Sequence, residues 1–99
     1  SKNIYYIKKM RRLKIIRICN INNTSYDVGG YYMLESNYVE PNDIFLDSKG
    51  NEFDVIDIKE IKIRSFYPKG LKKVSCIKTN IKLNVGDVIY VDLDRYETT

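Results

Sequence analysis

Apolar and polar residues alternate with a period of two along most of the chain, a pattern typical of β-strands with one buried face. Turn-forming Asn, Asp, Gly and Pro residues separate the alternating runs at intervals of about 8–12 residues. The pattern predicts strands at 13–21, twice within 31–47, and at 53–64, 74–83 and 88–96. We therefore expect an all-β protein, a small antiparallel β-barrel that is closed or nearly closed.

Residues 1–12 depart from this alternation. Their apolar positions, continuing from Ile4 to Leu13, recur every three residues among basic neighbours, which indicates a narrow helical stripe. This segment is expected to be a short helix or a basic arm. A chain of 99 residues has the size of one domain, so residues 13–99 are expected to form a single β-barrel domain.

Two short segments predict tight turns. The sequence DSKGNE at 47–52 favours a hairpin with Gly50 in the left-handed conformation, and NVGD at 84–87 favours a corner before the last strand. Within 53–64 the isoleucines change parity, because positions 56 and 58 share one face and positions 61 and 63 the other. Since a regular strand keeps its parity, we expect a β-bulge or sharp bend at Lys59–Glu60.

The composition excludes several kinds of chemistry. The chain has no histidine, which excludes imidazole as a general base, as the partner of a nucleophile and as a metal ligand. Gly29 and Gly30 form an isolated pair and not a glycine-rich phosphate loop. We therefore expect a protein without catalysis and without a cofactor.

The two cysteines, Cys19 and Cys76, lie far apart and form no Cys-x-x-Cys or Cys/His spacing, so the sequence predicts neither a zinc site nor a disulfide framework. Both are expected to be ordinary strand or core residues in a reduced, cytoplasmic setting. The chain contains no apolar stretch of about 18 residues. A membrane is therefore not among the expected partners.

Charged residues occur in blocks of alternating sign. Residues 1–21 carry seven positive and no negative side chains, and residues 59–83 carry eight positive side chains against Glu60. Residues 22–58 carry eight acids against Lys49, and the whole chain has a net charge of +4. Two interpretations follow. Basic strands pair with acidic strands across the sheet, or the two basic blocks meet on one face as a footprint for phosphates.

The segment LNVGDVIYVDLDR at 83–95 contains three acids that raise the question of a metal or acid–base site. Strand parity puts Asp92 and Asp94 on the face opposite the aliphatic residues, so both are expected to face solvent and to pair with a basic strand. Asp87 belongs to the preceding corner. The three carboxylates are therefore not expected to converge, and no metal site is predicted.

The order of turns and strands resembles the β-barrel second domain of translational GTPases such as elongation factor Tu. The resemblance covers roughly residues 13–95. It rests on a glycine-led strand after Gly30, a corner VEPND at 39–43, the strand FDVIDIKEIKI and the run KLNVGDVIYVDL. In that family the barrel helps to bind aminoacyl-tRNA or ribosomal RNA. The resemblance thus implies a translation-protein barrel acting as an RNA-facing or ribosome-facing adaptor, and it assigns no individual binding residue.

The best local candidate for binding is RSFYPKGLKK at 64–73, in which residues 65–73 are expected to form a loop. Two aromatic residues lie among four cations there. This combination suits single-stranded nucleic acids, because bases stack on aromatic rings and phosphates attract cations. Alternatively, the aromatic residues cover an end of the barrel and the lysines keep the loop soluble. The candidate nucleic-acid-binding residues are Arg64, Phe66, Tyr67, Lys69, Lys72 and Lys73.

Two hypotheses about function stay open. The first is a non-catalytic RNA- or ribosome-associated adaptor that uses this basic and aromatic segment. The second is a protein–protein interaction or structural domain, from a phage or a mobile element, with no nucleic-acid role. Tyr31, Tyr32 and Tyr38 are either anchors of such a protein-binding face or the large residues of half-buried strands.

Overall fold

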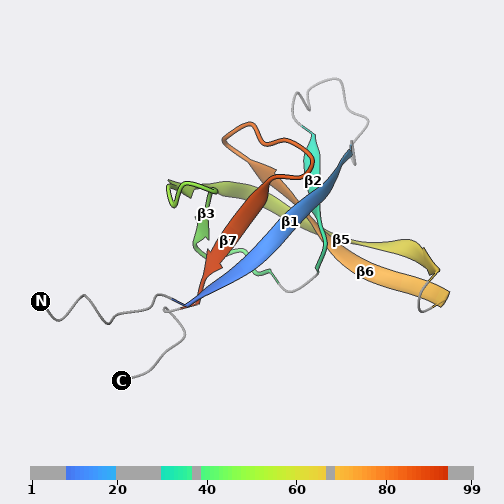
Figure 1. The fold of residues 1–99 in the computed structure, drawn as a ribbon. Helices are drawn as coiled ribbons and strands as arrows, with labels where there is room; N and C mark the ends of the chain where they lie inside the picture. Colours follow the sequence, from blue (N-terminus) through green and yellow to red (C-terminus); the bar gives the residue numbers. More distant parts are fainter. Residues whose placement is uncertain (1–8, 20–29, 37–38, 67–68, 94–99) are drawn as a thin grey trace, which may run out of the picture.

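The computed structural model describes residues 9–19, 30–36, 39–66 and 69–93. These ranges contain seven strands and no helix, and none of them holds a helix that could cross a membrane. The expectation of an all-β, antiparallel protein is confirmed. The strands are β1 (Met10–Cys19), β2 (Tyr31–Leu34), β3 (Phe45–Leu46), β4 (Glu52–Phe53), β5 (Val55–Phe66), β6 (Lys69–Thr79) and β7 (Val88–Asp92) (Figure 1).

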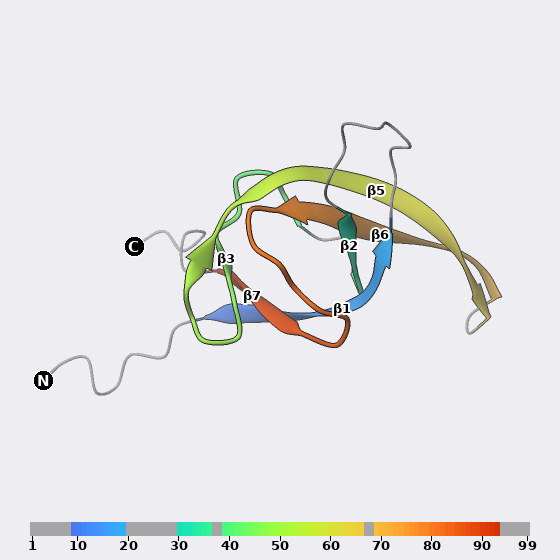
Figure 2. The ribbon, with the colours of Figure 1, turned by 90° about the horizontal axis from the view of Figure 1, so that it is seen from above.

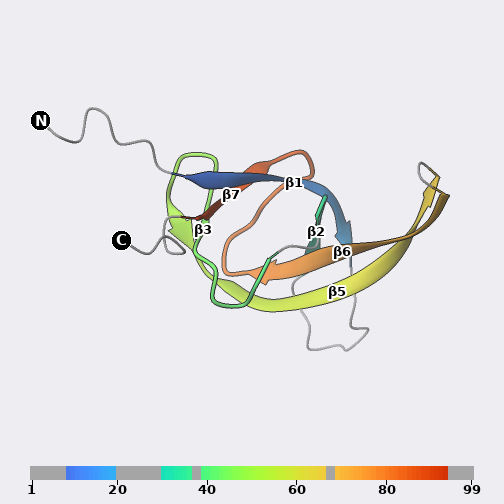
Figure 3. The same cartoon turned by 90° about the horizontal axis from the view of Figure 1, so that it is seen from below.

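All seven strands belong to one sheet, in the order β4-β3-β7-β1-β2-β6-β5. The sheet curls, so that β5 and β6 lie across from β1 and β7 (Figures 2 and 3). Its two edge strands, β4 and β5, are neighbours in sequence and are joined through Asp54. No backbone ladder joins β4 to β5 in the described ranges, so the sheet is not closed. Asp54 is held instead by Asn80, whose backbone N–H donates to the Asp54 carbonyl oxygen at 3.1 Å.

The main hydrophobic core lies within the curl of the sheet. Alternation places one face of each strand inward, and side chains from β1, β2, β3, β4, β6 and β7 meet there. Phe45 is 1% exposed, and its ring centroid lies 6.0 Å from that of Phe53 on the neighbouring strand. The buried members are Leu13, Ile15, Leu34, Val39, Phe45, Phe53, Ile77, Leu83, Ile89 and Val91.

A second, smaller hydrophobic cluster explains the change of parity among the isoleucines. Ile58 packs on the main core, whereas Ile61 and Ile63 pack on a cluster formed by Tyr31, Met33, Val74 and Cys76. The predicted bulge at Lys59–Glu60 is wrong, because the register with β6 runs without a break from Asp57 to Phe66. The irregularity lies between Val55 and Asp57. The main core covers one face of β5, and the second cluster covers the other face further along the strand. Isoleucines on both faces therefore pack against a core without an extra residue in the strand.

Both predicted turns are present. Gly50 has φ 86° and its N–H donates to the carbonyl oxygen of Asp47 at 3.0 Å. The backbone N–H of Asn51, more than that of Lys49, holds the pKa of the Asp47 carboxyl below its ordinary value. In the second turn Gly86 has φ 94°, and the side chain of Asp87 accepts the N–H of Asn84 at 2.9 Å. These turns depend on local hydrogen bonds and on positive φ, which the sequence displays directly.

Several strand boundaries differ from the expectation, among them the end of β6, which lies at Thr79 and not at residue 83. β1 begins at Met10 and not at Leu13, because β7 pairs with Met10, Arg11 and Arg12. Residues 1–8 of the predicted helix or arm lie outside the described residues. The predicted loop at 65–73 is also wrong: β5 continues to Phe66 and β6 begins at Lys69. Pairing between two strands supplies backbone hydrogen bonds to residues that have weak strand propensity on their own.

Of the acids in 83–95, Asp87 lies as predicted and Asp92 does not. Asp87 is in the turn before β7, as expected, but Asp92 is only 9% exposed and does not face solvent. β7 is an interior strand of the sheet, between β3 and β1, and Asp92 pairs with Met10 of β1 while its backbone N–H donates to the carbonyl oxygen of Ile44 at 2.9 Å. Asp94 lies outside the described residues. Among the residues described, no three His, Cys, Asp or Glu side chains gather as a metal site.

The two cysteines, far apart in sequence, meet in the fold. Cys19 ends β1 and Cys76 lies in β6, and their Sγ atoms are 3.9 Å apart, both as free thiols. Cys76 is 0% exposed. Burial away from water, with a smaller contribution from the nearby Cys19, raises the pKa of Cys76 from 9.0 to about 12. The Cys76 thiol is therefore protonated in the folded protein well into the alkaline range.

Stability is expected to fall as the pH rises above 9.0. The unfolded Cys76 then loses its proton while the folded residue, with its pKa raised to about 12, keeps it, so the unfolded state is favoured across that interval. The slope from this group is at most about 1.4 kcal/mol per pH unit. Urea denaturation at a series of alkaline pH values measures it. Cys76→Ala should show a shallower decline than the parent, and equal slopes would contradict the assignment.

Candidate nucleic-acid interface

The distal halves of β5 and β6 extend beyond the curled sheet as a projecting hairpin, which we define as residues 62–66 and 69–73 (Figures 1 and 2). Its strands remain in register to the tip, where Phe66 pairs with Lys69. Ile61 and Val74 at its base pack in the second cluster. Gly70 has φ 144°, in a region that favours glycine, and no atom lies within 4 Å of a Cβ placed there.

One face of the projecting hairpin collects cations and exposed apolar groups. Residues directly opposite in an antiparallel pair point to the same side of the sheet. The pairs Lys62–Lys73, Arg64–Leu71 and Phe66–Lys69 alternate along the hairpin with the pairs that face the other way. They define a basic face made of Lys62, Arg64, Phe66, Lys69, Leu71 and Lys73.

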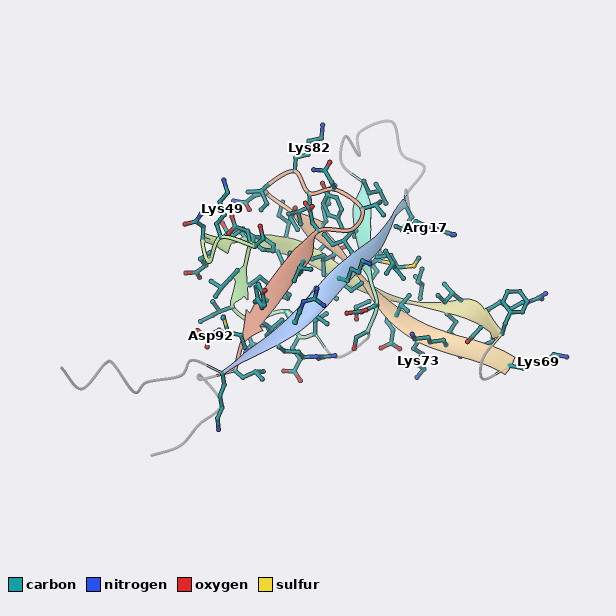
Figure 4. The ribbon with its side chains drawn as sticks, viewed as in Figure 1. Arg17, Lys49, Lys69, Lys73, Lys82 and Asp92 are labelled. Carbon is teal, nitrogen blue, oxygen red and sulfur yellow. The ribbon has the colours of Figure 1, made fainter. Side chains whose placement is uncertain are left out.

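The apolar members of the basic face are unusually open to solvent. Phe66 is 74% exposed and Leu71 is 72% exposed. Together with Arg64 and Lys69 and the backbone of the tip, they line a hollow of about 430 Å³. Two large apolar side chains exposed together beside a hollow are typical of a binding surface. Figure 4 shows Lys69 at the tip of the hairpin and Lys73 nearer its base.

The charges of the basic face are not balanced by the fold. Lys62 and Lys73 are directly opposite each other, an arrangement of like charges that destabilises the pair. Glu60 lies 3.7 Å from Lys73, but both side chains are more than half exposed, and such an ion pair contributes little. Within the part of the chain that the structure describes, the side chains of Lys62, Arg64 and Lys69 have no hydrogen-bond or ion-pair partner. The face therefore presents positive charge to solvent.

The structure brings together most, but not all, of the residues chosen from sequence. Arg64, Phe66, Lys69 and Lys73 share the basic face, whereas Lys72 pairs with Ile63 and points to the other side. Tyr67 lies outside the described residues. The alternative in which Phe66 covers the end of a barrel is wrong, because its side chain is 74% exposed on the projecting hairpin.

Sequence reasoning missed Lys62 and Leu71, which complete the basic face. The signal for them was present in the alternation at 62, 64 and 66 and again at 69, 71 and 73. Treating 65–73 as a loop discarded that period of two. A hairpin turning at 67–68 would have placed both residues correctly.

The tyrosines give little support to a protein-binding face. Tyr31 is 2% exposed, and its hydroxyl donates to Oδ2 of Asp57 at 2.5 Å. The Tyr32 hydroxyl accepts the N–H of Leu83 at 2.9 Å and its ring packs on the main core. Tyr38 lies outside the described residues. Of the two alternatives for the tyrosines, Tyr31 therefore fits the large residue of a buried strand and not the exposed anchor of an interface.

The first interpretation of the charge blocks, in which basic strands pair with acidic strands, holds for part of the sheet and fails in the projecting hairpin. β1, with its cations, pairs with β7, which ends at Asp92, so one basic strand does lie beside an acidic segment. In the projecting hairpin, however, cations pair with cations, as at Lys62 and Lys73. The second basic block therefore gathers its charge on a surface of its own.

Comparison of the chain with protein-family models, with curated proteins and with solved structures gave no match.

Proposed function

We propose that this protein is a non-catalytic binding module of the cytoplasm that binds single-stranded RNA, free or exposed on the ribosome, through the basic face of its projecting hairpin. The observation that carries the proposal is the hollow at the tip, where the exposed Phe66 and Leu71 lie beside Arg64 and Lys69. Duplexes hide their base faces, whereas single strands offer both a base to stack and a phosphate to neutralise.

The two kinds of side chain have separate tasks in this proposal. Phe66 offers a ring face on which a base stacks, an interaction worth about 1–3 kcal/mol per base in other proteins. Lys62, Lys69 and Lys73 attract phosphates without regard to sequence. Arg64 serves both purposes, because a guanidinium stacks on bases and donates to phosphate oxygens. The module consequently favours single strands with weak sequence preference.

The curled sheet acts in this proposal as a nearly closed barrel of the translation-protein kind. The two edge strands of the sheet, β4 and β5, follow each other in the chain and are joined at Asp54. This short connection between the two edges supports a barrel-like scaffold. A scaffold of this kind holds the hairpin away from the body and leaves its basic face accessible. An adaptor for RNA or the ribosome needs such a combination of rigid body and projecting contact surface.

A protein-binding role is the second candidate, and the exposure of Phe66 and Leu71 favours it, because exposed apolar groups also mark protein interfaces. The charge of the basic face would then require an acidic partner. The two roles differ in their response to single-stranded RNA, and the following experiment separates them.

Fluorescence anisotropy measures the binding of a labelled single-stranded RNA of about ten nucleotides at a series of salt concentrations. The logarithm of the binding constant is expected to fall linearly with the logarithm of the salt concentration. The Lys69→Ala/Lys73→Ala variant should lower the slope by about 1.4, because each phosphate contact on a single strand contributes about 0.7. Lys49→Ala/Lys82→Ala removes the same charge from parts of the molecule away from the projecting hairpin (Figure 4) and should keep the parental slope.

Three results would count against the binding of RNA by the basic face. They are no binding at low salt, binding that is insensitive to salt, and an equal loss in the two double variants. The last result would mean that net charge alone, and not the basic face, attracts the nucleic acid.

A further inference from the structure

A second hollow, of about 440 Å³, lies at the base of the projecting hairpin and is lined by Ile16, Arg17, Met33, Ile63 and Arg64. We propose that it is a second nucleotide subsite, which holds the base that follows, along the same strand, the base stacked at the tip. This inference rests on the function proposed above and specifies its ligand: a single strand that spans two adjacent sites and not one isolated nucleotide.

The two hollows are connected through one residue. Arg64 lines both the hollow at the tip and the hollow at the base. Ile63, its neighbour on β5, faces the base hollow from the side of the hairpin opposite the basic face, while Phe66 stands at the tip, roughly 10 Å further along the strand. Because β5 is an edge strand of the sheet, a nucleic-acid strand can pass around this edge from one hollow to the other. A guanidinium between two hollows can donate to the phosphate that links two nucleotides and stack on either base.

An irregularity in β1 builds the far side of this subsite. The pairing of β1 with β2 shifts between Ile15 and Arg17, so that Ile16 is an extra residue on β1 and Arg17 lies opposite Met33. Without the extra residue, strand parity would put Arg17 on the same side as Ile15, which is buried in the main core. Figure 4 shows Arg17 pointing away from β1 on the side where the hairpin projects.

The lining has the chemistry that a nucleotide requires. Met33 is 4% exposed and forms an apolar floor, and Ile16, 39% exposed, adds an aliphatic wall. Arg17 and Arg64 supply two guanidinium groups, and none of the described residues that line the hollow is a carboxylate. An apolar floor accepts the face of a base, and two cations accept the phosphate beside it. The volume falls in the range of pockets that hold small organic ligands.

The subsite also unites the two basic blocks of the sequence. Arg17 belongs to the block at 1–21 and Arg64 to the block at 59–83, and they come together only because β1 and β5 both border this hollow. Positive charge from two separate segments around an apolar floor favours a polyanion with planar apolar groups. An uncharged apolar peptide would gain nothing from the two arginines.

Anisotropy measurements with single-stranded RNAs of increasing length test the second subsite. The series extends from the shortest oligonucleotide that binds to one that covers both hollows. Arg17→Ala should weaken binding of the long oligonucleotide about fivefold and leave the shortest one unchanged. Phe66→Ala should weaken binding at every length. Arg12→Ala, which removes another exposed arginine of β1 outside the hollow, is the matched control and should resemble the parent.

Each alternative outcome has a distinct meaning. If no oligonucleotide binds at any length, the proposed function and the subsite both fail. If Phe66→Ala weakens binding but Arg17→Ala does not, RNA binding stands and the second subsite is overturned. Equal losses in Arg17→Ala and Arg12→Ala at all lengths would also overturn it, because they would show a general effect of charge.

Discussion

Replacing Phe66 by alanine is expected to weaken the binding of single-stranded RNA by about 1–3 kcal/mol, that is, about 5–150-fold. The ring is 74% exposed, so it contributes little to folding and its removal acts on the ligand. Titration of labelled RNA at fixed salt gives the loss. Thermal unfolding of the same variant should differ little from the parent, which would assign the effect to the interface and not to the fold.

Two further variants make this result specific. Phe66→Trp retains a stacking surface and should preserve the affinity or raise it. Val85→Ala shortens an exposed apolar side chain, 57% accessible, in the turn before β7 and should leave RNA binding unchanged. If Phe66→Ala binds RNA as tightly as the parent, stacking on Phe66 does not contribute to binding. Equal losses of affinity in Phe66→Ala and Val85→Ala would indicate a non-specific apolar effect.

The largest effect on stability is expected from Phe45→Ala, which should lower the free energy of unfolding by about 3–5 kcal/mol. Phe45 is 1% exposed, contacts the ring of Phe53, and lies on the short strand β3 opposite Val91. Removing its ring leaves a cavity where β3, β4 and β7 meet. Since domains of this size are stable by only about 5–15 kcal/mol, the variant should lose a large share of its stability.

Urea denaturation followed by circular dichroism measures this loss. Ile56→Ala is the control, because Ile56 is 63% exposed at the irregularity of β5 and its truncation should change stability by no more than about 0.5 kcal/mol. Similar midpoints for the two variants would mean that the main core is not organised around Phe45. A change in the denaturant slope would point instead to an altered unfolded state.

The proposed site and the main core lie on different parts of the same two strands, β5 and β6. Near the body, β5 and β6 contribute Ile58 and Ile77 to the main core, and further out they carry Arg64 and Phe66 in the projecting hairpin. The stable half positions the exposed half. Variants of the basic face should thus alter binding without altering stability, and Phe45→Ala should do the reverse at temperatures where it is folded.

Local features of this protein could be predicted from its sequence. Alternation with a period of two identified the β-strands, and the turns at Gly50 and at Asn84–Asp87 were recognisable from residues that form local hydrogen bonds or accept positive φ. Four of the six candidate binding residues also share one face, because the cations and the aromatic ring occur together in sequence.

What covers each face of a strand could not be predicted in this way. Asp92 was expected in solvent but lies on an interior strand, and Cys19 and Cys76, far apart in sequence, have their sulfur atoms 3.9 Å apart. The apparent bulge at Lys59–Glu60 was inferred from one core, whereas Ile58 and Ile61 pack on two. Alternation shows which residues share a side but says nothing of the neighbour that packs against it.

The sequence by itself therefore determined an all-β chain, its turns, and a segment rich in cations and aromatic residues. Only the tertiary structure decided that this segment is a projecting hairpin, that Lys62 and Leu71 join it, and that Arg17 meets Arg64 across a hollow. The physical reason is that backbone preference and turn chemistry act between near neighbours in the chain. Strand order and burial, in contrast, depend on contacts between residues far apart in sequence, whose free energy emerges only when the whole sheet forms.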